Sequence, residues 1–257
     1  MNRNWILAAG LTTVLGATGA TAAHHAAATP AYVTAALADP GRPAKESELD
    51  ADRKPAAMIA FAGIKPGSRV MDIVPGSGYF THIFAKVVGD KGYVYAYTPS
   101  ETDAYFQKQF PGADPKKQFA AYGNVSVIHG PINSLAAPET LDVVWTAQNY
   151  HDLHDPFFAP ADLAVINKAV FATLKPGGIY IVLDHSAPDG SGLADTNTTH
   201  RIDEAVVKQE VLAAGFKFVG ESNVLRNPKD PRDKLVFDAS IRHHTDQFIL
   251  KFMKPRH

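Results

Sequence analysis

The amino-acid sequence predicts an α/β fold built on a doubly wound, mostly parallel sheet that ends in an antiparallel hairpin. From residue 53 onward, short apolar β-branched runs alternate with stretches of helical spacing. The first of these runs is followed at once by a glycine-containing turn and then by a helical stretch, which is the opening of a βαβ unit. The last two runs have only a polar loop between them. The chain has 257 residues, 46% of them hydrophobic, which suits one sizeable core.

The first 23 residues have the pattern of a secretory signal peptide. Arg3 gives a positive start, residues 5–15 are largely apolar, and Ala20-Thr21-Ala22 supplies the small residues of a cleavage site. We expect a mature chain that begins near Ala23 or His24, in a bacterial periplasm or outside the cell. The apolar run is shorter than the roughly 20 residues that span a bilayer, so we expect no stable membrane anchor after cleavage. An uncleaved anchor is the alternative.

Residues 24–52 are predicted to form a helical arm outside the main sheet. This stretch is rich in alanine and is broken at Pro40-Gly41 and Pro43. It is interpreted as a lid or cap, with a spacer as the alternative. Residues 53–257 then form the α/β domain, whose first helix is expected to use Asp52 as a cap and to end at Gly63.

Within that domain seven runs are predicted as strands and three stretches as clear helices. The strands are residues 69–74, 93–97, 125–128, 141–145, 178–183, 216–224 and 247–253; the helices are residues 79–88, 161–174 and 206–214. In a doubly wound sheet, ligands bind at the carboxyl ends of the strands. Polar side chains at those ends are therefore the candidates for a functional site.

The turn after the first strand, Pro75-Gly76-Ser77-Gly78, suits a close approach of backbone to ligand. A dinucleotide fingerprint would place a third glycine at position 81, where this sequence has Thr81. The phosphate-binding loop of nucleotide hydrolases is also absent, because no Gly-Lys-Ser/Thr follows. By itself the turn is weak evidence, and a tight turn with no ligand is the alternative.

Four segments in order resemble class I S-adenosylmethionine-dependent methyltransferases, and more closely an exported branch of predicted methyltransferases. Residues 70–81 resemble the family's first motif, 141–145 the strand before the reaction site, 174–180 the turn into the fifth strand, and 207–219 the next helix and strand. The resemblance covers most of residues 53–253. It implies a Rossmann-like, seven-stranded, mostly parallel sheet with helices on both faces, S-adenosyl-L-methionine as cofactor, and methyl transfer.

The resemblance also implies which residues hold the cofactor. In the first motif and the next two strand ends these are Asp72, Pro75, Gly76, Ser77, Gly78, Tyr79, Thr98 and Asn133. The sequence departs from the family's pattern in two places. Val74-Pro75 stand where a glycine and a small residue are usual, and Thr98 stands where an acidic residue normally bonds the ribose. A hydroxyl lacks the charge-assisted strength of a carboxylate, a difference of roughly 1 kcal/mol.

Candidate catalytic residues follow the fourth and fifth predicted strands. His151 is expected to act as general base, since its ordinary pKa lies near 6.5, with Asp152 orienting its ring. Four further side chains are expected to shape the acceptor pocket and one to clamp an anionic group: Tyr150, His154, Asp184 and His185, with Arg201 as the clamp. The alternatives are a polar loop whose carboxylates cap a helix, and a metal site formed by His151 and His154 with Asp155 or Asp184. No metal is assigned.

Composition narrows the function further. The chain has no cysteine, which excludes disulfides, thiolate metal sites and a cysteine nucleophile. Its formal charge is -1, so no general basic field attracts nucleic acid. The sequence thus predicts an exported methyltransferase with a small-molecule acceptor. A catalytically degenerate protein that binds a small ligand or metal is the alternative, and hydrolysis at a His/Asp metal centre is a third hypothesis.

Overall fold

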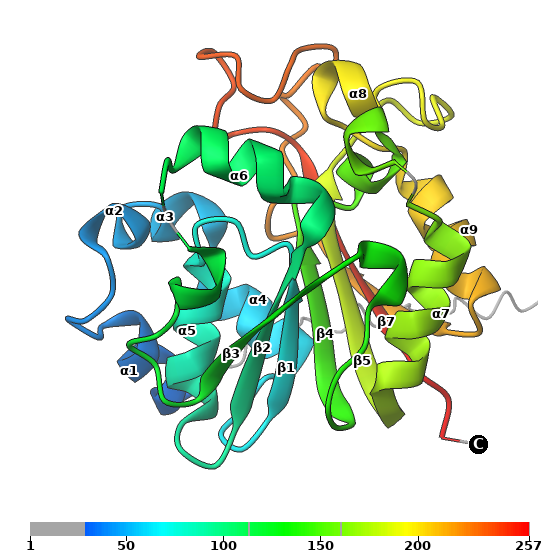
Figure 1. Ribbon diagram of the computed structural model, residues 1–257. Coiled ribbons are helices and arrows are strands. Elements are labelled where there is room, and N and C mark those ends of the chain that lie inside the picture. Colours follow the sequence, from blue (N-terminus) through cyan, green and yellow to red (C-terminus); the bar gives the residue numbers. More distant parts are fainter. Residues whose placement is uncertain (1–28, 113, 160, 257) are drawn as a thin grey trace, which may run out of the picture.

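The computed structural model confirms the predicted fold class. It describes residues 29–112, 114–159 and 161–256, so the predicted signal peptide and His24-His25 lie outside the described residues. One seven-stranded sheet runs through the molecule in the order β3-β2-β1-β4-β5-β7-β6 (Figure 1). The first five strands pair in parallel, whereas β7 is antiparallel to both β5 and β6. The terminal hairpin is therefore confirmed.

The strand bounds agree with the predicted runs to within a few residues. They are β1 (Arg69–Ile73), β2 (Tyr93–Pro99), β3 (Val125–Gly130), β4 (Leu141–Ala147), β5 (Leu174–His185), β6 (Lys217–Ser222) and β7 (Gln247–Met253). The main difference is β5, which begins before the glycine pair that was expected to separate helix from strand. Leu174 already pairs with Leu141, and a register shift absorbs the extra residues before Ile179 meets Val143.

Helices cover both faces of the sheet. One face packs against α1 (Ala31–Leu37), α4 (Pro55–Ala62) and α5 (Tyr79–Val88), and the other against α7 (Leu163–Thr173) and α9 (Glu204–Ala213). Alternate strand residues supply the two cores: Val143 and Trp145 of β4 face the first set, and Val144 faces the second. Burial of both faces explains why the central strands are continuous apolar runs.

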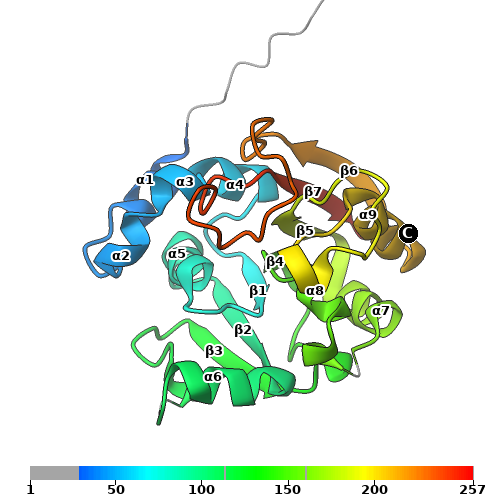
Figure 2. The same ribbon diagram turned by 90° about the horizontal axis from the view of Figure 1, so that it is seen from above.

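The N-terminal arm lies beside α4 and α5 rather than over the carboxyl ends of the strands (Figure 2). It contains α1, α2 (Ala44–Ser47) and α3 (Asp50–Arg53). Arg42 clamps the Asp50 carboxylate through two bonds of 2.8 Å, and Tyr79 donates to the same carboxylate at 2.7 Å. The expected cap Asp52 is part of α3 instead, and Lys54, with φ of 48°, precedes α4.

Loops and short helices gather at the carboxyl ends of the parallel strands (Figure 1). They include α6 (Asp103–Gln109), α8 (Thr196–Thr199) and the long connection between β6 and β7. Short 3-10 helices are η1 (Ser100–Thr102), η2 (Pro115–Lys117), η3 (Ile132–Ser134), η4 (His151–His154) and η5 (Pro156–Phe158). Within the described part of the chain, every helix is too short or too polar to cross a bilayer.

Candidate active site

A cavity of about 680 Å³ opens at the carboxyl ends of β1, β2, β4 and β5. Its volume lies within the usual range of small-molecule sites, roughly 300–1,000 Å³. The polar and turn residues that line it include Val74, Pro75, Gly76, Ser77, Thr98, Asp103, Gln148, His151, Asp152, Asp155, His185 and His200. Aromatic rings form much of the rest of the wall: Tyr105, Phe106, Phe110, Phe157, Phe158 and Phe237. The cover therefore comes from α6, η5, α8 and the β6–β7 connection, since no arm residue lines the cavity among those the structure describes.

The first turn presents its backbone to this cavity. Gly76 has φ of 56°, and a Cβ added there would meet nothing within 4 Å. Val74, at the position where the family has glycine, keeps the same left-handed conformation with φ of 56° despite its branched side chain. Such a conformation costs a β-branched residue of order 1–3 kcal/mol, and strain of this kind concentrates at functional sites. The turn thus keeps a shape that a ligand-binding loop needs, although one glycine is missing.

Two further residues of the first motif support the turn from behind. Gly78, with φ of 96°, precedes α5, and a Cβ there would lie 2.5 Å from the Phe119 ring. The Tyr79 hydroxyl is used by Asp50, with the Arg53 guanidinium 4.6 Å from the centre of the Tyr79 ring. Neither residue lines the cavity. Their contact with a cofactor stays a prediction, and in this structure both fix how α5 starts.

Asp72 is a buried anchor for α5. Its carboxylate accepts a 2.7 Å bond from the Thr81 hydroxyl and is not among the cavity-lining groups. Burial raises the pKa of Asp72 to about 7, against the opposing effect of bonds from the Thr81 hydroxyl and amide. The fingerprint position Thr81 therefore has a structural role, which is to hold the acidic residue of the first strand.

The stability of the protein is expected to depend on pH through Asp72. Between the ordinary pKa of 3.8 and about 7, the folded state keeps a proton that the unfolded state releases, so stability falls as pH rises. The penalty above pH 7 is on the order of 4 kcal/mol. We expect Asp72→Asn to gain stability relative to the parent as pH rises through this window in urea unfolding series. A difference between the two proteins that is the same at pH 4 and pH 8 would contradict the assignment.

Thr98 and Asn133, the two residues expected to bond the cofactor after the second and third strands, lie in different places. Thr98 lines the cavity, and its hydroxyl donates to the Ile128 carbonyl at 3.4 Å. Asn133 does not line the cavity; its side-chain oxygen accepts a 2.8 Å bond from the amide of Asp162, ahead of α7. Asp103 was missed by the sequence reasoning. It provides the lining carboxylate that follows β2, and it bonds His129 Nε2 at 2.9 Å.

His151 is held by the carboxylate at the end of β5. Asp184 accepts from the His151 ring Nδ1 and from the His151 amide, both at 2.8 Å, and it also accepts from the amide of His185. Asp184 is fully buried and does not line the cavity. It is thus a positioning group rather than the acceptor-pocket residue that was expected.

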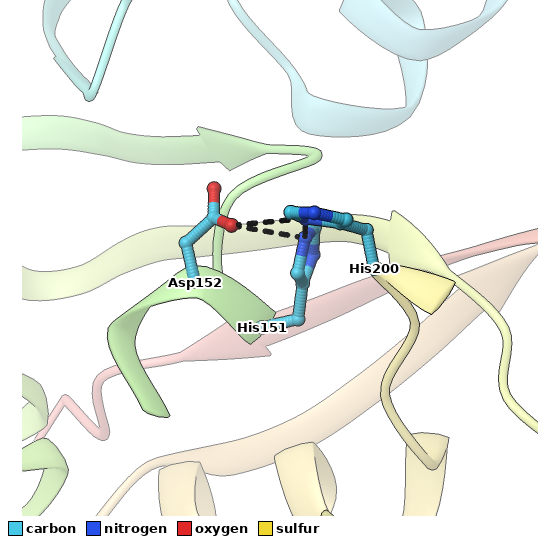
Figure 3. Close-up of side chains that lie close together, drawn as sticks. All are labelled: His151, Asp152 and His200. Carbon is cyan, nitrogen blue, oxygen red and sulfur yellow. Dashed lines mark hydrogen bonds and ion pairs between the residues drawn. The ribbon is translucent and has the colours of Figure 1, made fainter. Parts of the chain in front are cut away.

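The second ring nitrogen of His151, Nε2, lies next to two side chains that line the cavity (Figure 3). It lies 3.1 Å from Asp152 Oδ1 and 3.2 Å from His200 Nδ1. Burial lowers the pKa of His151, but Asp184 and Asp152 outweigh burial and raise it to about 10. That direction opposes the expected role of His151 as a base at neutral pH. His200, which was not singled out by sequence, has φ of 56° and brings a second imidazole from the loop after β5.

Two predicted pocket residues belong to a separate hydrogen-bond network around Glu210. The Tyr150 hydroxyl donates to Glu210 at 2.8 Å and accepts from Asn167 at 2.8 Å. His154 Nε2 lies 3.3 Å from the same Glu210 carboxylate. Neither residue lines the cavity, and the expected metal pair of His151 and His154 does not converge. The two rings are held by different partners, His151 by Asp184 and His154 by Glu210.

Arg201 and His185 complete the predicted set. Arg201 is fully buried; its guanidinium bonds Asp230 at 2.8 and 3.2 Å and also the Ser186 and Lys234 carbonyls. It anchors the β6–β7 connection, so the geometry leaves no free group to clamp a substrate. His185 does line the cavity, with its Nδ1 2.8 Å from the Thr245 hydroxyl, and burial lowers its pKa to about 3.

The fold and the cavity together define a class of protein. The strand order reverses between β1 and β4, and the cavity lies outside the carboxyl ends of the strands on both sides of that switch point, where doubly wound proteins bind ligands. A family model described as protein-L-isoaspartate(D-aspartate) O-methyltransferase matches residues 30–100, which span the arm, the first turn and β2. The match therefore includes the Gly76 turn.

Relatives and solved structures agree with that match. The chain is 28% identical over 199 residues to the ubiquinone/menaquinone biosynthesis C-methyltransferase UbiE of Teredinibacter turnerae, covering 76% of this chain and 68% of that one. The Vibrio cholerae UbiE is 27% identical over 201 residues, covering 76% and 65%. The chain thus spans about two thirds of the length of these relatives.

Among solved structures, a SAM-dependent methyltransferase from Aquifex aeolicus superposes with a TM-score of 0.54 at 20% identity, covering 82% of this chain and 98% of that one. The [4+2]-cyclase SpnF has a TM-score of 0.55 at 17% identity, covering 80% and 82%. The glycopeptide N-methyltransferase MtfA, solved with sinefungin, has 0.52 at 14%, covering 85% and 90%. The chain has the fold of class I S-adenosylmethionine-dependent methyltransferases, and these findings support S-adenosylmethionine as its cofactor.

Proposed function

We propose that this protein is an S-adenosylmethionine-dependent methyltransferase that acts on a small-molecule acceptor. The observation that carries the proposal is one continuous cavity, lined by the first-turn loop at Gly76 and by Asp152 and His200 across from it. A methyl donor held at the loop would thus share an enclosed space with an acceptor held at the polar side chains. Methyl transfer needs that proximity and alignment above all.

The residues on the loop side fit the cofactor. The open space over Gly76 admits a close ligand, and α5, a ten-residue helix, begins just beyond the turn. The N-terminus of such a helix favours a carboxylate like that of methionine. When bound, the cofactor supplies a methyl group already activated on a sulfonium. The backbone at Gly76 and Ser77 would hold its amino-acid part, and the cavity-lining Thr98 and Asp103 would bond the hydroxyl groups of its ribose.

The opposite wall favours an acceptor with an apolar, planar body. Tyr105 and Phe157 meet edge to face at 5.9 Å, and Phe237 contacts His200 with a ring separation of 5.4 Å. Aromatic walls of this kind bind flat apolar molecules and exclude water. The UbiE relatives, which are named as C-methyltransferases of ubiquinone and menaquinone biosynthesis, support an acceptor of this planar kind.

The polar groups next to that wall would hold the nucleophile. Asp152 and His200 both line the cavity, and each offers an atom that accepts a hydrogen bond from an acceptor hydroxyl or amine. Asp184 keeps the His151 ring in place behind them through two 2.8 Å bonds. Burial raises the pKa of Asp152, but bonds to His151 and His200 outweigh burial and lower it to about 2. The Asp152 carboxylate is therefore ionised and best placed to orient the acceptor's proton through a hydrogen bond, with His151 as its support.

A non-catalytic binding protein is the second candidate. Thr98 stands where a carboxylate is usual, and Asp103 is engaged by His129. The [4+2]-cyclase SpnF also has this fold at a TM-score of 0.55, so the fold does not by itself fix methyl transfer. This candidate predicts that the cofactor binds and no methyl group moves.

Transfer of a labelled methyl group decides between the two. We expect the protein, supplied with methyl-labelled cofactor and a periplasmic small-molecule extract, to label an extractable product. Asp152→Asn should lower the rate by about 100-fold, the lower range for loss of a group that assists proton transfer, while cofactor affinity by calorimetry stays the same. Cofactor binding with no labelled product from any extract would refute methyl transfer and support the binding protein.

We further propose that the protein is exported. The support is the charge and apolar pattern of residues 3–22 with its small-residue cleavage site. Expression in a bacterial host should yield a periplasmic protein whose N-terminal sequence starts at Ala23 or His24. Recovery of the uncleaved chain in the cytoplasm alone would contradict export.

A further inference from the structure

We propose that His151, Asp152 and His200 form a binding site for one divalent transition-metal ion at the acceptor side of the cavity (Figure 3). Three donor atoms converge there: His151 Nε2, Asp152 Oδ1 and His200 Nδ1. They come from η4 and from the end of α8, so two loops far apart in sequence meet at this point.

The triangle formed by the three atoms has the dimensions of a metal-coordination face. Its edges are 3.1 Å from His151 to Asp152, 3.2 Å from His151 to His200, and 3.5 Å from Asp152 to His200. Zinc bonds to nitrogen and carboxylate oxygen are about 2.0–2.1 Å long, and two ligands at tetrahedral angles are then about 3.3 Å apart. An ion could therefore sit above the triangle without large movements of the side chains. Two imidazoles and one carboxylate form a donor set that suits zinc, iron or cobalt rather than magnesium or calcium.

The surroundings of His151 resemble those of a metal ligand. Its Nδ1 bonds to Asp184 Oδ1 at 2.8 Å, which fixes the ring, and the ion would displace the proton that Nε2 directs toward Asp152. The side chain of His151 is 3% exposed and that of Asp184 is fully buried. A carboxylate behind a coordinating histidine is the usual arrangement at protein metal sites, where it orients the ring and increases its basicity. Asp184 would thus act as a positioning residue for the metal.

The open side of the site faces the cavity. All three donors line the cavity, and so does Asp155, whose Oδ1 is buried and accepts no hydrogen bond from the described residues. A buried carboxylate oxygen without a donor is costly, and a water or hydroxyl held on the ion would supply one. The ion would then present its free position to an acceptor that carries a hydroxyl or phenol oxygen. This choice of acceptor rests on the proposed function, whereas the metal site stands without it.

Cobalt and zinc titrations of the full chain, without an affinity tag, test the site directly. We expect one equivalent of Co²⁺ to bind with the visible absorption of a four- or five-coordinate ion and to be displaced by Zn²⁺. His200→Ala should weaken binding by at least about 100-fold, and Asp184→Asn by about 10–100-fold, the range measured for such supporting carboxylates. If His200→Ala is unstable, Asp152→Asn is the second variant, because it removes a ligand atom from a half-buried side chain with little change of shape.

Two control variants test whether other histidines bind the metal. His244→Ala removes an exposed imidazole and His154→Ala removes the neighbour in η4; both should leave the affinity unchanged. Saturable binding that survives in His200→Ala and Asp152→Asn would overturn the site, as would binding lost only when His24 and His25 are replaced together. The titration contains neither cofactor nor acceptor. Failure to bind metal therefore leaves methyl transfer standing, and metal binding without methyl transfer leaves the site standing.

Discussion

Gly76→Val is expected to abolish binding of S-adenosylmethionine while the protein stays folded. Gly76 has φ of 56°, and its missing side chain leaves open space on the wall of the cavity. A valine would fill the space that the ligand needs, and the left-handed conformation would add roughly 1–2 kcal/mol of strain. We expect the affinity measured by calorimetry to fall by at least about 100-fold, and thermal unfolding to remain cooperative.

Gly67→Val is the matched control for that variant. Gly67 has φ of 84° and also has nothing within 4 Å of an added Cβ, but it lies in the turn before β1, at the opposite edge of the sheet. It therefore carries a similar backbone cost without touching the cavity. Equal loss of affinity in both variants would mean that strain, and not the blocked space, is responsible, and it would remove the first turn from the cofactor site.

Asp230→Ala is expected to lower the free energy of unfolding by about 3–5 kcal/mol, the usual cost of leaving one partner of a buried ion pair uncompensated. The guanidinium of Arg201 and the carboxylate of Asp230 are both fully buried, and Asp230 also accepts a 2.6 Å bond from the amide of Asp246. Urea unfolding followed by circular dichroism measures the change. Because this pair holds the connection that carries Phe237, the aromatic wall of the cavity should loosen as well.

The exposed ion pair between Asp189 and Arg232 is the control for the buried pair. Asp189 lies 2.9 Å from Arg232, but its side chain is 97% exposed, so Asp189→Ala should change stability by less than about 1 kcal/mol. If both variants unfold at the same urea concentration, the buried pair contributes no more to the free energy of unfolding than the exposed pair does. Arg201 would then again be a candidate for binding an anionic substrate.

The fold was predictable because its signals are local. Each central strand is a continuous apolar run, helix α5 matches residues 79–88 as predicted, and Gly63 and the residue pattern after it separate α4 from β1. Burial of both sheet faces requires such runs wherever the strands are placed, so they are visible without knowledge of their neighbours. The arm was less predictable, because Asp52 can cap a helix or belong to one, and only packing decides.

The site was predictable as a region and less so residue by residue. Topology brings every loop after a parallel strand to the same edge, so the loop after β4 was correctly placed beside the first turn. Which side chains face the cavity depends on how the loops pack on one another. Arg201 turns inward because Asp230, 29 residues later, offers a buried carboxylate, and its neighbour His200 turns outward in a left-handed conformation. No spacing rule in the sequence reveals which of these two neighbouring side chains turns inward.

The most direct test of the account is a crystal structure of the protein with S-adenosylhomocysteine, the product that methyl transfer would leave. We expect the amino-acid part at Gly76 and Ser77, the ribose near Thr98, and the sulfur directed across the cavity toward Asp152 and His200. Such a complex would join the two sides of the cavity in one reaction space. Density for the product elsewhere on the molecule, or none at saturating concentration in crystals whose cavity is open, would contradict it.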